Sequence, residues 1–446
     1  MDFFESHSPV LHEVSFRLLL FLSLQRGWDV TSIDIEKAFL EAPLQEDIFV
    51  KPPPGLQYVK TIPDQSICKL HKAVYGLVQA SRAFYKEITT FLTNVSFFIL
   101  SKTEPCLMFK ITDSGEQIIA GLYVDDLLFV GPKHLIENEI KTIKTKYKIR
   151  TQSPVDEFVG CQIVKRDDSF ILHQQRLIDK MELFFHKQLT STRLTVTPMA
   201  THFHIHRPFE NEDFLNPQDL KLYQSGTGTL LYLIKHSRPD IANAVRELSK
   251  AMDRSNIENL QAMYKLIKYV VHTRNYGVKI TLNKTEDIFP LRLTCFTDSD
   301  WAGDADTRKS ISGWIIFIQD NPICWGSRQQ RITAGSSTEA EYIGISDICK
   351  ELLFLIHIIE FLKVKVDMPV KIYVDNKGAI FIAENPVVKR TKHIDTWFHI
   401  IREHIENDII KIQFITSVNT ADIFRKNTTE ETHNKHRDKI VTQFTD

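Results

Sequence analysis

The adjacent acids Asp125 and Asp126 interrupt IIAGLYVDDLLFVG, an apolar segment of the kind that is buried in a folded protein. A buried charge needs a partner or a metal ion. Because neighbouring residues of a strand face opposite ways, both carboxylates reach one place only if the doublet lies at the turn of a hairpin. We therefore expect a strand, a turn and a second strand here. A solvated Asp-Asp turn at the surface is the alternative.

A third acid, Asp34, lies near the end of the short alternating stretch TSIDI, in the same predicted domain. Carboxylate oxygens are the ligands that Mg²⁺ prefers. Two such ions can activate an attacking hydroxyl and stabilise the leaving oxygens of a phosphoryl transfer. The three acids together therefore predict metal-dependent phosphoryl transfer.

Four more acids follow predicted strands or helix starts in the last third of the chain: Asp298, Glu341, Asp375 and Asp422. Each by itself is more often a solvated acid or a helix cap. Glu339 is an alternative to Glu341 on the same predicted helix. Asp300 would share the face of Asp298 if the strand continued that far.

The composition of the chain is that of a folded protein. It has 446 residues, of which 43% are hydrophobic and 25% charged, which argues against disorder, collagen-like repeats and coiled coil. The 55 basic residues balance the 56 acidic ones, so a nucleic-acid partner must be argued from local patches. Six cysteines without a CxxC pair argue against zinc modules and a disulfide framework and favour a reducing intracellular compartment. No apolar run is long enough to predict a signal peptide or a membrane segment.

The positions of helical and strand-like patterns predict an α+β multidomain protein. Residues 1–132 alternate short β-rich runs with helical stretches. Residues 133–200 contain a Lys-rich helix or strand, a hairpin and a helix, and residues 201–288 are mostly helical. Residues 289–428 begin with strands and then alternate helix and strand, which predicts a mixed sheet covered by helices. Residues 429–446 form a polar tail that we expect to be frayed.

The segments SIDIEKAFL, KAVYGLVQASRAFY, LYVDDLLFVG and EFVGCQI, in this order and spacing, resemble the reverse transcriptase of copia-type LTR retrotransposons. FTDSDWAG, RKSISGW, ICWGSRQQ, SSTEAEY and KRTKHID resemble the ribonuclease H domain of the same family. The resemblance runs from about Phe4 to Lys426. It implies a right-hand polymerase, with a palm and partial fingers (1–132), the rest of the palm and a thumb-like segment (133–200) and a connection (201–288). An α/β ribonuclease H-like domain (289–428) follows.

The resemblance also implies residue roles. Asp34, Asp125 and Asp126 would be catalytic and hold metal together with the backbone carbonyl of Ile35, while Phe39 would stack under the incoming sugar and leave no room for a ribose 2′-hydroxyl. The loop beside nucleotide and template would contain Tyr75, Gly76 and Gln79, and the hairpin at the primer end Val159 and Gly160. In the ribonuclease H domain the catalytic metal ligands would be Asp298, Glu341, Asp375 and Asp422.

The implied cofactor is Mg²⁺, two ions per site, with Mn²⁺ as an alternative. The implied partners are an RNA template, a DNA primer, RNA–DNA hybrid and dNTPs, and other Pol or capsid products are further candidates, in a cytoplasmic particle or the nucleus. Basic residues that would grip a duplex follow the YVDD hairpin (Lys141, Lys144, Lys146, Lys148 and Arg150) and frame the second acidic set (Arg308, Lys309, Arg328, Arg331, Lys389, Arg390 and Lys392). For the first group, a solvated helix face is the alternative.

The chain departs from the family pattern at several positions. Finger strands that precede the first catalytic strand in the family do not appear, so we expect a fragment. Glu41-Ala42 stands where Asn-Gly is usual, and Arg425 and Asn427 stand where ADIFTKP is typical. Two alternatives to a reverse transcriptase with ribonuclease H activity therefore stay open: a non-catalytic nucleic-acid-binding remnant, and a chain with ribonuclease H activity alone.

Overall fold

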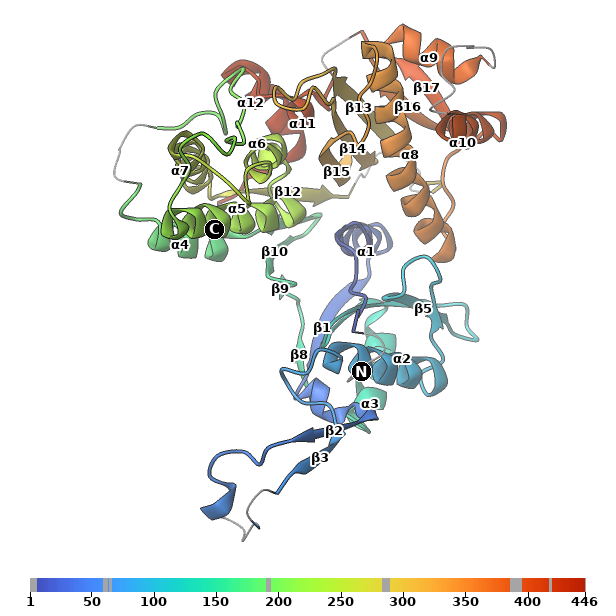
Figure 1. The fold of residues 1–446 in the computed structure, drawn as a ribbon. Coiled ribbons are helices and arrows are strands. Elements are labelled where there is room, and N and C mark those ends of the chain that lie inside the picture. Colours follow the sequence, from blue (N-terminus) through green and yellow to red (C-terminus); the bar gives the residue numbers. More distant parts are fainter. Residues whose placement is uncertain are drawn as a thin grey trace. The chain divides into compact units, whose positions relative to one another are not determined.

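The computed structural model describes residues 6–58, 63, 66–189, 194–282, 289–385, 395–416 and 419–445 (Figure 1). The chain divides into two compact units, Met1–Val159 and Gly160–Asp446. In the described ranges, no helix combines the length and the apolar character needed to cross a bilayer. The mixed helix-and-sheet, multidomain organisation expected from the sequence is confirmed. The finer domain boundaries stay predictions.

The first unit is built on an antiparallel sheet with the strand order β4-β5-β6-β7-β1-β8. Its strands are β1 (Asp29–Ile35), β4 (Ile99–Leu100), β5 (Leu107–Ile111), β6 (Gln117–Tyr123), β7 (Asp126–Gly131) and β8 (Ile149–Gln152). The short strand β9 (Glu157–Phe158) follows β8 in the chain. Almost every residue of β6 and β7 is buried, which requires cover on both faces of the sheet.

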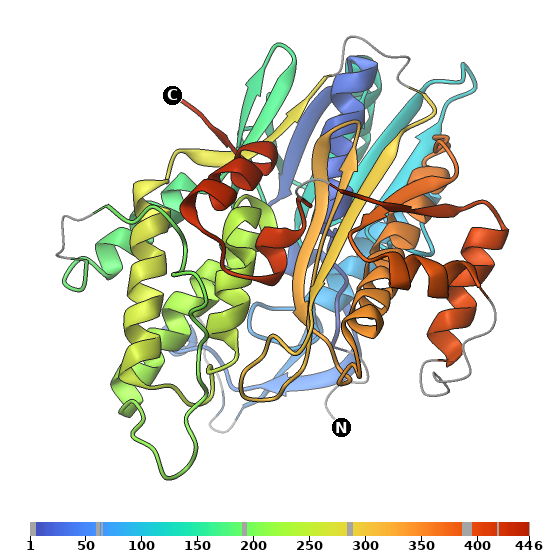
Figure 2. The same ribbon diagram turned by 90° about the horizontal axis from the view of Figure 1, so that it is seen from above.

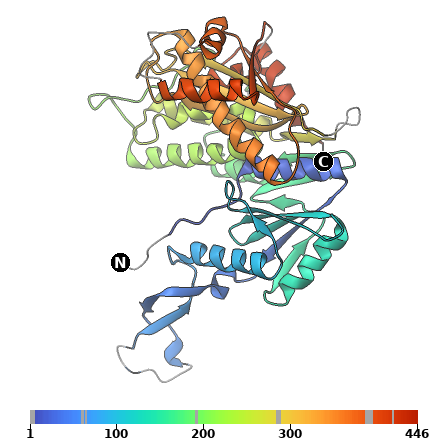
Figure 3. The ribbon, with the colours of Figure 1, turned by 90° about the vertical axis from the view of Figure 1, so that its right-hand side faces the viewer.

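Helices α1 (Glu13–Arg26), α2 (Ala80–Asn94) and α3 (Lys133–Lys144) provide that cover. Helix α1 lies on one side of the sheet, and α2 and α3 lie on the other (Figures 1 and 3). Helix α1 is apolar around most of its circumference and is almost wholly buried, as expected for a helix inside a core. It ends at Gly27, whose left-handed backbone (φ 62°) provides a C-terminal cap.

A separate two-stranded sheet, β2 (Pro43–Val50) and β3 (Cys68–Lys72), projects from the first unit (Figure 3). The 3₁₀ turn η1 (Ala38–Glu41) leads into β2, and a second 3₁₀ turn, η2 (Leu56–Tyr58), lies in the connection to β3. Burial alternates along β2, so one face of this hairpin is exposed.

The first part of the second unit contains a hairpin and a group of helices. Strands β10 (Cys161–Arg166) and β11 (Ser169–His173) form the hairpin expected from the sequence, and β12 (Tyr276–Thr281) and β18 (Thr442–Gln443) extend its sheet. The helical elements are α4 (Gln175–Phe184), α5 (Pro217–His236), η3 (Pro239–Ile241), α6 (Ala242–Ser249) and α7 (Ile257–His272). Their apolar faces share one core, so the mostly helical character expected for this region is confirmed.

The second part is a mixed sheet with the order β15-β14-β13-β16-β17. Strands β13 (Leu293–Asp300), β14 (Ile311–Ile318) and β15 (Asn321–Gln329) pair antiparallel, and their long neighbouring arrows are visible in Figure 2. Strands β16 (Val370–Val374) and β17 (Ile410–Phe414) join the sheet in parallel. The helices are α8 (Ser337–Phe361), α9 (Lys377–Glu384), α10 (Asp395–Glu406) and α11 (Asp422–Arg425). This is the mixed sheet with helical cover that the sequence predicts.

The expectation of a frayed tail is wrong. Residues Glu430–Ile440 form helix α12, in which Thr429 accepts a hydrogen bond from the backbone N–H of Thr432 as the N-cap. His433, His436 and Ile440 are buried and lie on one face of the helix. The tail is polar in composition, but its buried face holds it against the second unit.

Candidate active sites

The strand register brings the first three acids together. Asp34 on β1 lies opposite Asp126 on β7 in the antiparallel ladder. Asp125 lies in the turn between β6 and β7, beside Val124, whose left-handed backbone (φ 56°) allows the reversal. The backbone N–H of Ile35 donates to the carbonyl of Asp125 across 3.2 Å, which ties this turn to the end of β1. The hairpin-turn placement expected from the sequence is confirmed, and all three carboxylates lie at one end of the sheet.

These carboxylates repel one another. Burial, followed by the charges of Asp125 and Asp34, raises the pKa of Asp126 to about 6. Burial and the charge of Asp34 also raise the pKa of Asp125. Half-buried acids that share negative charge in this way are stabilised by a cation, and oxygen ligands suit a hard divalent ion. The donor set therefore fits Mg²⁺ or Mn²⁺.

Phe39, the aromatic residue expected under the incoming sugar, follows β1 closely in the sequence. Phe39 is in η1, directly after β1, and its ring centroid lies 4.8 Å from that of Tyr75 and 6.4 Å from that of Phe84. Tyr75 itself is 59% exposed, so one side of this aromatic pair faces solvent. Gly76 has a left-handed backbone (φ 98°) that favours glycine.

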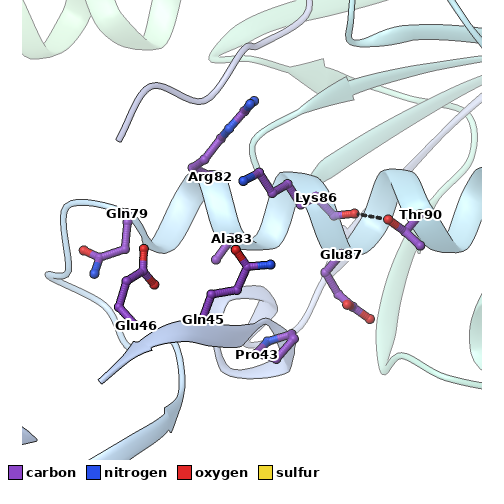
Figure 4. A pocket seen from close by; sticks show the side chains of 9 residues that line it. All are labelled: Pro43, Gln45, Glu46, Gln79, Arg82, Ala83, Lys86, Glu87 and Thr90. Atoms are coloured by element: carbon purple, nitrogen blue, oxygen red, sulfur yellow. Dashed lines mark hydrogen bonds between the residues drawn. The ribbon is translucent and has the colours of Figure 1, made fainter. Parts of the chain in front are cut away.

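A cavity of about 400 Å³ lies between β2 and α2 (Figure 4). Gln79, just before α2, lines its wall together with Glu46 from β2 and with Arg82 and Lys86 from α2. Figure 4 shows Gln79 and Glu46 directed toward one another between helix and strand, whereas Arg82 extends away from the strand. The loop residue Gln79 thus belongs to a polar cavity, whereas Tyr75 and Gly76 do not line it.

The remaining residues expected to contact nucleic acid in the first unit occupy two places. Val159, with a left-handed backbone (φ 54°), is the last residue of the first unit, and Gly160 (φ 62°) is the first residue of the second. The basic residues from Lys141 to Arg150 lie on α3, in the connection that follows it and at the start of β8, and their side chains are exposed. Two of its members have acidic partners, because Arg150 contacts Glu36 at 3.0 Å and Lys146 contacts Glu87.

The second acidic set comes from four elements of the mixed sheet and its helices. Asp298 is on β13, Glu341 on the second turn of α8, Asp375 directly after β16 and Asp422 at the start of α11. Oxygens of Asp298, Glu341 and Asp375 all lie within 4.8 Å of one another, which makes them a candidate metal group among the described residues. Asp34, Asp125 and Asp126 are also among the described residues, but their ligand atoms do not form so tight a group.

Two glycines allow the close packing that places these acids. Gly313 on β14 lies opposite Asp298, and a Cβ there would be 2.7 Å from the Cβ of Phe424 in α11. Gly344 on α8 faces β13, where a Cβ would be 2.5 Å from Oγ of Ser299. Real Cβ atoms do not approach so closely, so a side chain at either position would push a ligand-bearing helix away from the sheet.

One buried oxygen of Asp298 and one of Glu341 lack a hydrogen-bond partner. Asp298 is 1% exposed and Glu341 5% exposed, and Oδ1 of Asp298 and Oε2 of Glu341 accept no hydrogen bond. The other oxygen of Glu341 accepts from the backbone N–H of Ser299 at 3.0 Å. Burial and the charge of Asp375 raise the pKa of Glu341 to about 7, and burial raises the pKa of Asp298 well above its usual range. Unpartnered buried carboxylate oxygens that converge on one point fit a divalent cation.

The choice between the two glutamates of α8 can be made from their contacts. Glu339 accepts a hydrogen bond from the backbone N–H of Gly335 at 2.8 Å and is half-buried at the start of the helix. Glu341 is the one that faces the other acids. Asp300 is the last residue of β13 and lies 3.7 Å from Arg425.

Sequence reasoning missed Arg425 as a member of this site. Its guanidinium contacts Oδ2 of Asp298 and lies 3.0 Å from Oδ1 of Asp422. This charge, together with that of Lys426, outweighs burial and lowers the pKa of Asp422. The departure from the family pattern at position 425 was the available signal.

Two of the basic residues expected around these acids, Arg328 and Arg331, line a second cavity. This hollow of about 360 Å³ lies beside α8 and is also lined by Lys350, which the sequence did not indicate. Arg308 and Lys309 lie in the loop between β13 and β14. Lys389, Arg390 and Lys392 lie outside the described residues.

Comparison with known proteins identifies the family of this chain. Residues 1–201 match the family model described as reverse transcriptase (RNA-dependent DNA polymerase). The chain is 30% identical over 420 residues to the retrovirus-related Pol polyprotein from transposon RE1 of Arabidopsis thaliana, covering 94% of this chain and 28% of that protein. It is 31% identical over 434 residues to the corresponding polyprotein from transposon TNT 1-94 of Nicotiana tabacum, covering 96% of this chain and 32% of that protein.

This chain belongs to the copia-type retrotransposon Pol family. It spans about a third or less of the length of the curated relatives named above. A solved structure similar to this Pol sequence is the foamy viral protease-reverse transcriptase in complex with RNA/DNA hybrid, with 13% identity and a TM-score of 0.47, covering 87% of this chain and 44% of that one.

Proposed function

We propose that this copia-type Pol chain is an RNA-directed DNA polymerase with ribonuclease H activity. The observation that carries the proposal is the register of β1 and β7, which sets Asp34 opposite Asp126, with Asp125 in the adjoining turn. The family match over residues 1–201 supports the polymerase assignment. The acids of the mixed sheet support the nuclease assignment.

In the polymerase site, Asp34, Asp125 and Asp126 would hold two divalent cations, with the carbonyl of Ile35 as a further ligand. Such ions, when bound, lower the pKa of a primer 3′-hydroxyl and neutralise charge on the leaving pyrophosphate. The three carboxylates place their negative charges at one end of the sheet. The primer end and the nucleotide would be positioned there for reaction.

Selection of the sugar would come from the aromatic pair Phe39 and Tyr75. The ring of Phe39 is held by Tyr75 at 4.8 Å and by Phe84 at 6.4 Å, so it cannot easily swing aside. A ribose 2′-hydroxyl above that ring would clash, which selects deoxynucleotides. Gln79 and Arg82, in the cavity between β2 and α2, offer hydrogen-bond donors for the template strand.

In the nuclease site, the acidic set Asp298, Glu341, Asp375 and Asp422 would support metal-dependent hydrolysis of the RNA strand of a hybrid, with the metal between Asp298, Glu341 and Asp375. A bound divalent cation supplies an activated water and stabilises the departing 3′ oxygen. The cationic side chains of Arg328, Arg331 and Lys350 line one hollow and suit the phosphates of a duplex. We propose RNA template, DNA primer, RNA–DNA hybrid and dNTPs as partners, in a cytoplasmic particle or the nucleus.

A single gel assay tests both activities. The purified chain, with Mg²⁺, is given a labelled RNA template annealed to a DNA primer, and primer extension and RNA cleavage are scored together. We expect both products. Asp125→Asn should abolish extension and keep cleavage, and Asp375→Asn should do the reverse.

The other outcomes select the alternatives. Cleavage without extension would leave ribonuclease H activity alone. The absence of both products from a folded protein would favour a nucleic-acid-binding remnant. If either single substitution removed both activities, the assignment of two separate sites would be wrong.

A further inference from the structure

The guanidinium of Arg425 lies among the carboxylates of the proposed nuclease site. Its Nε donates to Oδ2 of Asp298, its Nη2 lies 3.0 Å from Oδ1 of Asp422, and its Nη1 lies 3.7 Å from Oδ1 of Asp300. The side chain is 15% exposed, so the charge is held largely away from water. One cation therefore already bridges acids from β13 and α11.

The contacts divide the carboxylate oxygens into two groups. Oδ2 of Asp298 and Oδ1 of Asp422 are taken by Arg425. Oδ1 of Asp298 and Oε2 of Glu341 are buried without a hydrogen-bond partner. Asp298, Glu341 and Asp375 each offer one carboxylate oxygen, and these ligand atoms lie within 4.8 Å of one another. One side of Asp298 thus faces an open cation position, and the other side faces a position filled by the protein itself.

We infer that Arg425 is an internal cation that occupies the second metal position of the nuclease site, so that the free protein binds a single divalent ion there, between Asp298, Glu341 and Asp375. This inference rests on the proposed ribonuclease H function for its biological meaning. It departs from the expectation of two ions in that site. It concerns this chain in particular, because the family pattern has a threonine at position 425.

The guanidinium of Arg425 excludes a second divalent ion from this position for three physical reasons. A guanidinium is charged at any ordinary pH and binds carboxylates through several donors in a fixed plane. It is tethered to α11, so its effective concentration at Asp422 far exceeds that of a dissolved ion. A second divalent ion between Asp298 and Asp422 would meet a like charge at contact distance in a partly buried site, where repulsion is weakly screened. A metal ion and the guanidinium therefore compete for the same oxygens.

The test counts bound ions in the full-length chain. Mn²⁺ is titrated into the protein, and free Mn²⁺ is followed by its electron paramagnetic resonance signal. Arg425→Thr should bind one more Mn²⁺ per chain than the unmodified protein, because the guanidinium no longer occupies the second position. Ions bound in the first unit are the same in both proteins and cancel in the comparison. Arg292→Thr is the matched control: it removes the same charge from the residue before β13, where Arg292 contacts Asp320 at 3.4 Å, and should leave the count unchanged.

A second pair of variants keeps the inference testable if Arg425→Thr does not fold, which circular dichroism would reveal. Asp422→Asn should leave the Mn²⁺ count of the resting protein unchanged, since Oδ1 of Asp422 contacts Arg425 and Lys426 rather than a metal. Asp375→Asn should lower the count by one. A lost ion in Asp422→Asn, or no gained ion in a folded Arg425→Thr, would overturn the inference.

These readouts are independent of the proposed activity. If the counts follow the expectation but no RNA is cleaved under any condition, the ribonuclease H proposal fails and the occupancy by Arg425 stands. If RNA is cleaved but the unmodified chain already binds two ions beside Asp298, the inference fails and the function stands.

Discussion

Asp34 and Asp126 face each other across the antiparallel pairing of β1 and β7. Backbone pairing alone therefore fixes the separation of two acids that are 92 positions apart in the sequence. Asp125 depends on a different element, the turn whose carbonyl accepts from the N–H of Ile35. The site therefore depends on strand pairing for two of its acids and on a turn for the third.

The first prediction concerns Asp126. Asp126→Asn removes a charged metal ligand but keeps the size of the side chain, so primer extension should fall by at least about 100-fold while RNA cleavage stays unchanged. The gel assay described above measures both. Asp113→Asn, in the exposed turn before β6, is the control and should keep both activities. Unimpaired extension by the Asp126 variant would remove this acid from the site.

The second prediction concerns sugar selection. Phe39→Ala opens space beneath the incoming nucleotide, so the preference for deoxynucleotides over ribonucleotides should drop at least about tenfold in kcat/KM. Single-nucleotide incorporation with each substrate measures the ratio. Phe49→Ala removes an aromatic ring from β2 that is 54% exposed and should leave the ratio as it is. An unchanged ratio for Phe39→Ala would mean that another residue reads the sugar.

The third prediction concerns a buried ion pair in the second unit. Arg238 and Asp240 are both fully buried, joined at 2.8 Å, and Tyr269 donates to Asp240 at 3.1 Å. Asp240→Ala would leave the guanidinium buried without its counter-ion and should cost about 3–5 kcal/mol of unfolding free energy. Urea unfolding, followed by tryptophan fluorescence, measures this.

Asp253→Ala is the control for that experiment. Asp253 pairs with Arg207 at the surface, and its loss should change stability far less. Equal effects of the two substitutions would contradict a structural role for the buried pair.

The fourth prediction concerns pH. Burial lowers the pKa of His433 to about 4, while the unfolded chain keeps a value of about 6.5. Between these values the unfolded state binds a proton that the folded state does not, so the contribution of His433 to stability is complete above about pH 6.5 and is lost as the pH falls toward 4. Glu341, with its raised pKa, contributes with the opposite sign.

The comparison of two proteins isolates the histidine. Unfolding free energies of the unmodified chain and of His433→Gln are measured from pH 7.5 to 4.5, and their difference should shrink as the pH falls. Parallel curves would show that His433 does not resist protonation in the fold.

The fifth prediction concerns Gly313. Gly313→Ala places a Cβ 2.7 Å from that of Phe424, which should displace α11 and reduce RNA cleavage while primer extension continues. Gly228→Ala, on α5, meets no atom within 4 Å and should be neutral or stabilise by up to about 1 kcal/mol. If Gly313→Ala cleaves RNA normally, the close approach of α11 is not needed for the site.

Much of the fold could be predicted because local patterns agree with it. The apolar run around Asp125 and Asp126, the hairpin at Cys161–His173 and the long helix α8 all follow from the periodicity of their own residues. The order of the motifs also located the acids of both sites. These features depend on neighbouring residues, which sequence reasoning can weigh.

Two features could not be predicted because they depend on distant packing. The buried face of helix α12 consists largely of histidines rather than aliphatic residues. The segment NTTEETHNKHRDKI therefore lacks the apolar pattern of a packed helix and is predicted to be a solvated tail. Arg425 meets Asp298 across 127 positions of sequence, and only the packing of α11 on β14 brings them together. Its unusual presence after ADIF was visible, but its position among the acids was not.

The pairing of β18 with β12 sets an order of events during synthesis. Gly277 and Tyr276 on β12 pair with Thr442 and Gln443, which are synthesised more than 160 residues later. Until then β12 presents an open strand edge, the kind of surface on which nascent chains associate. The β18 edge of this sheet can therefore form only after translation has passed residue 443.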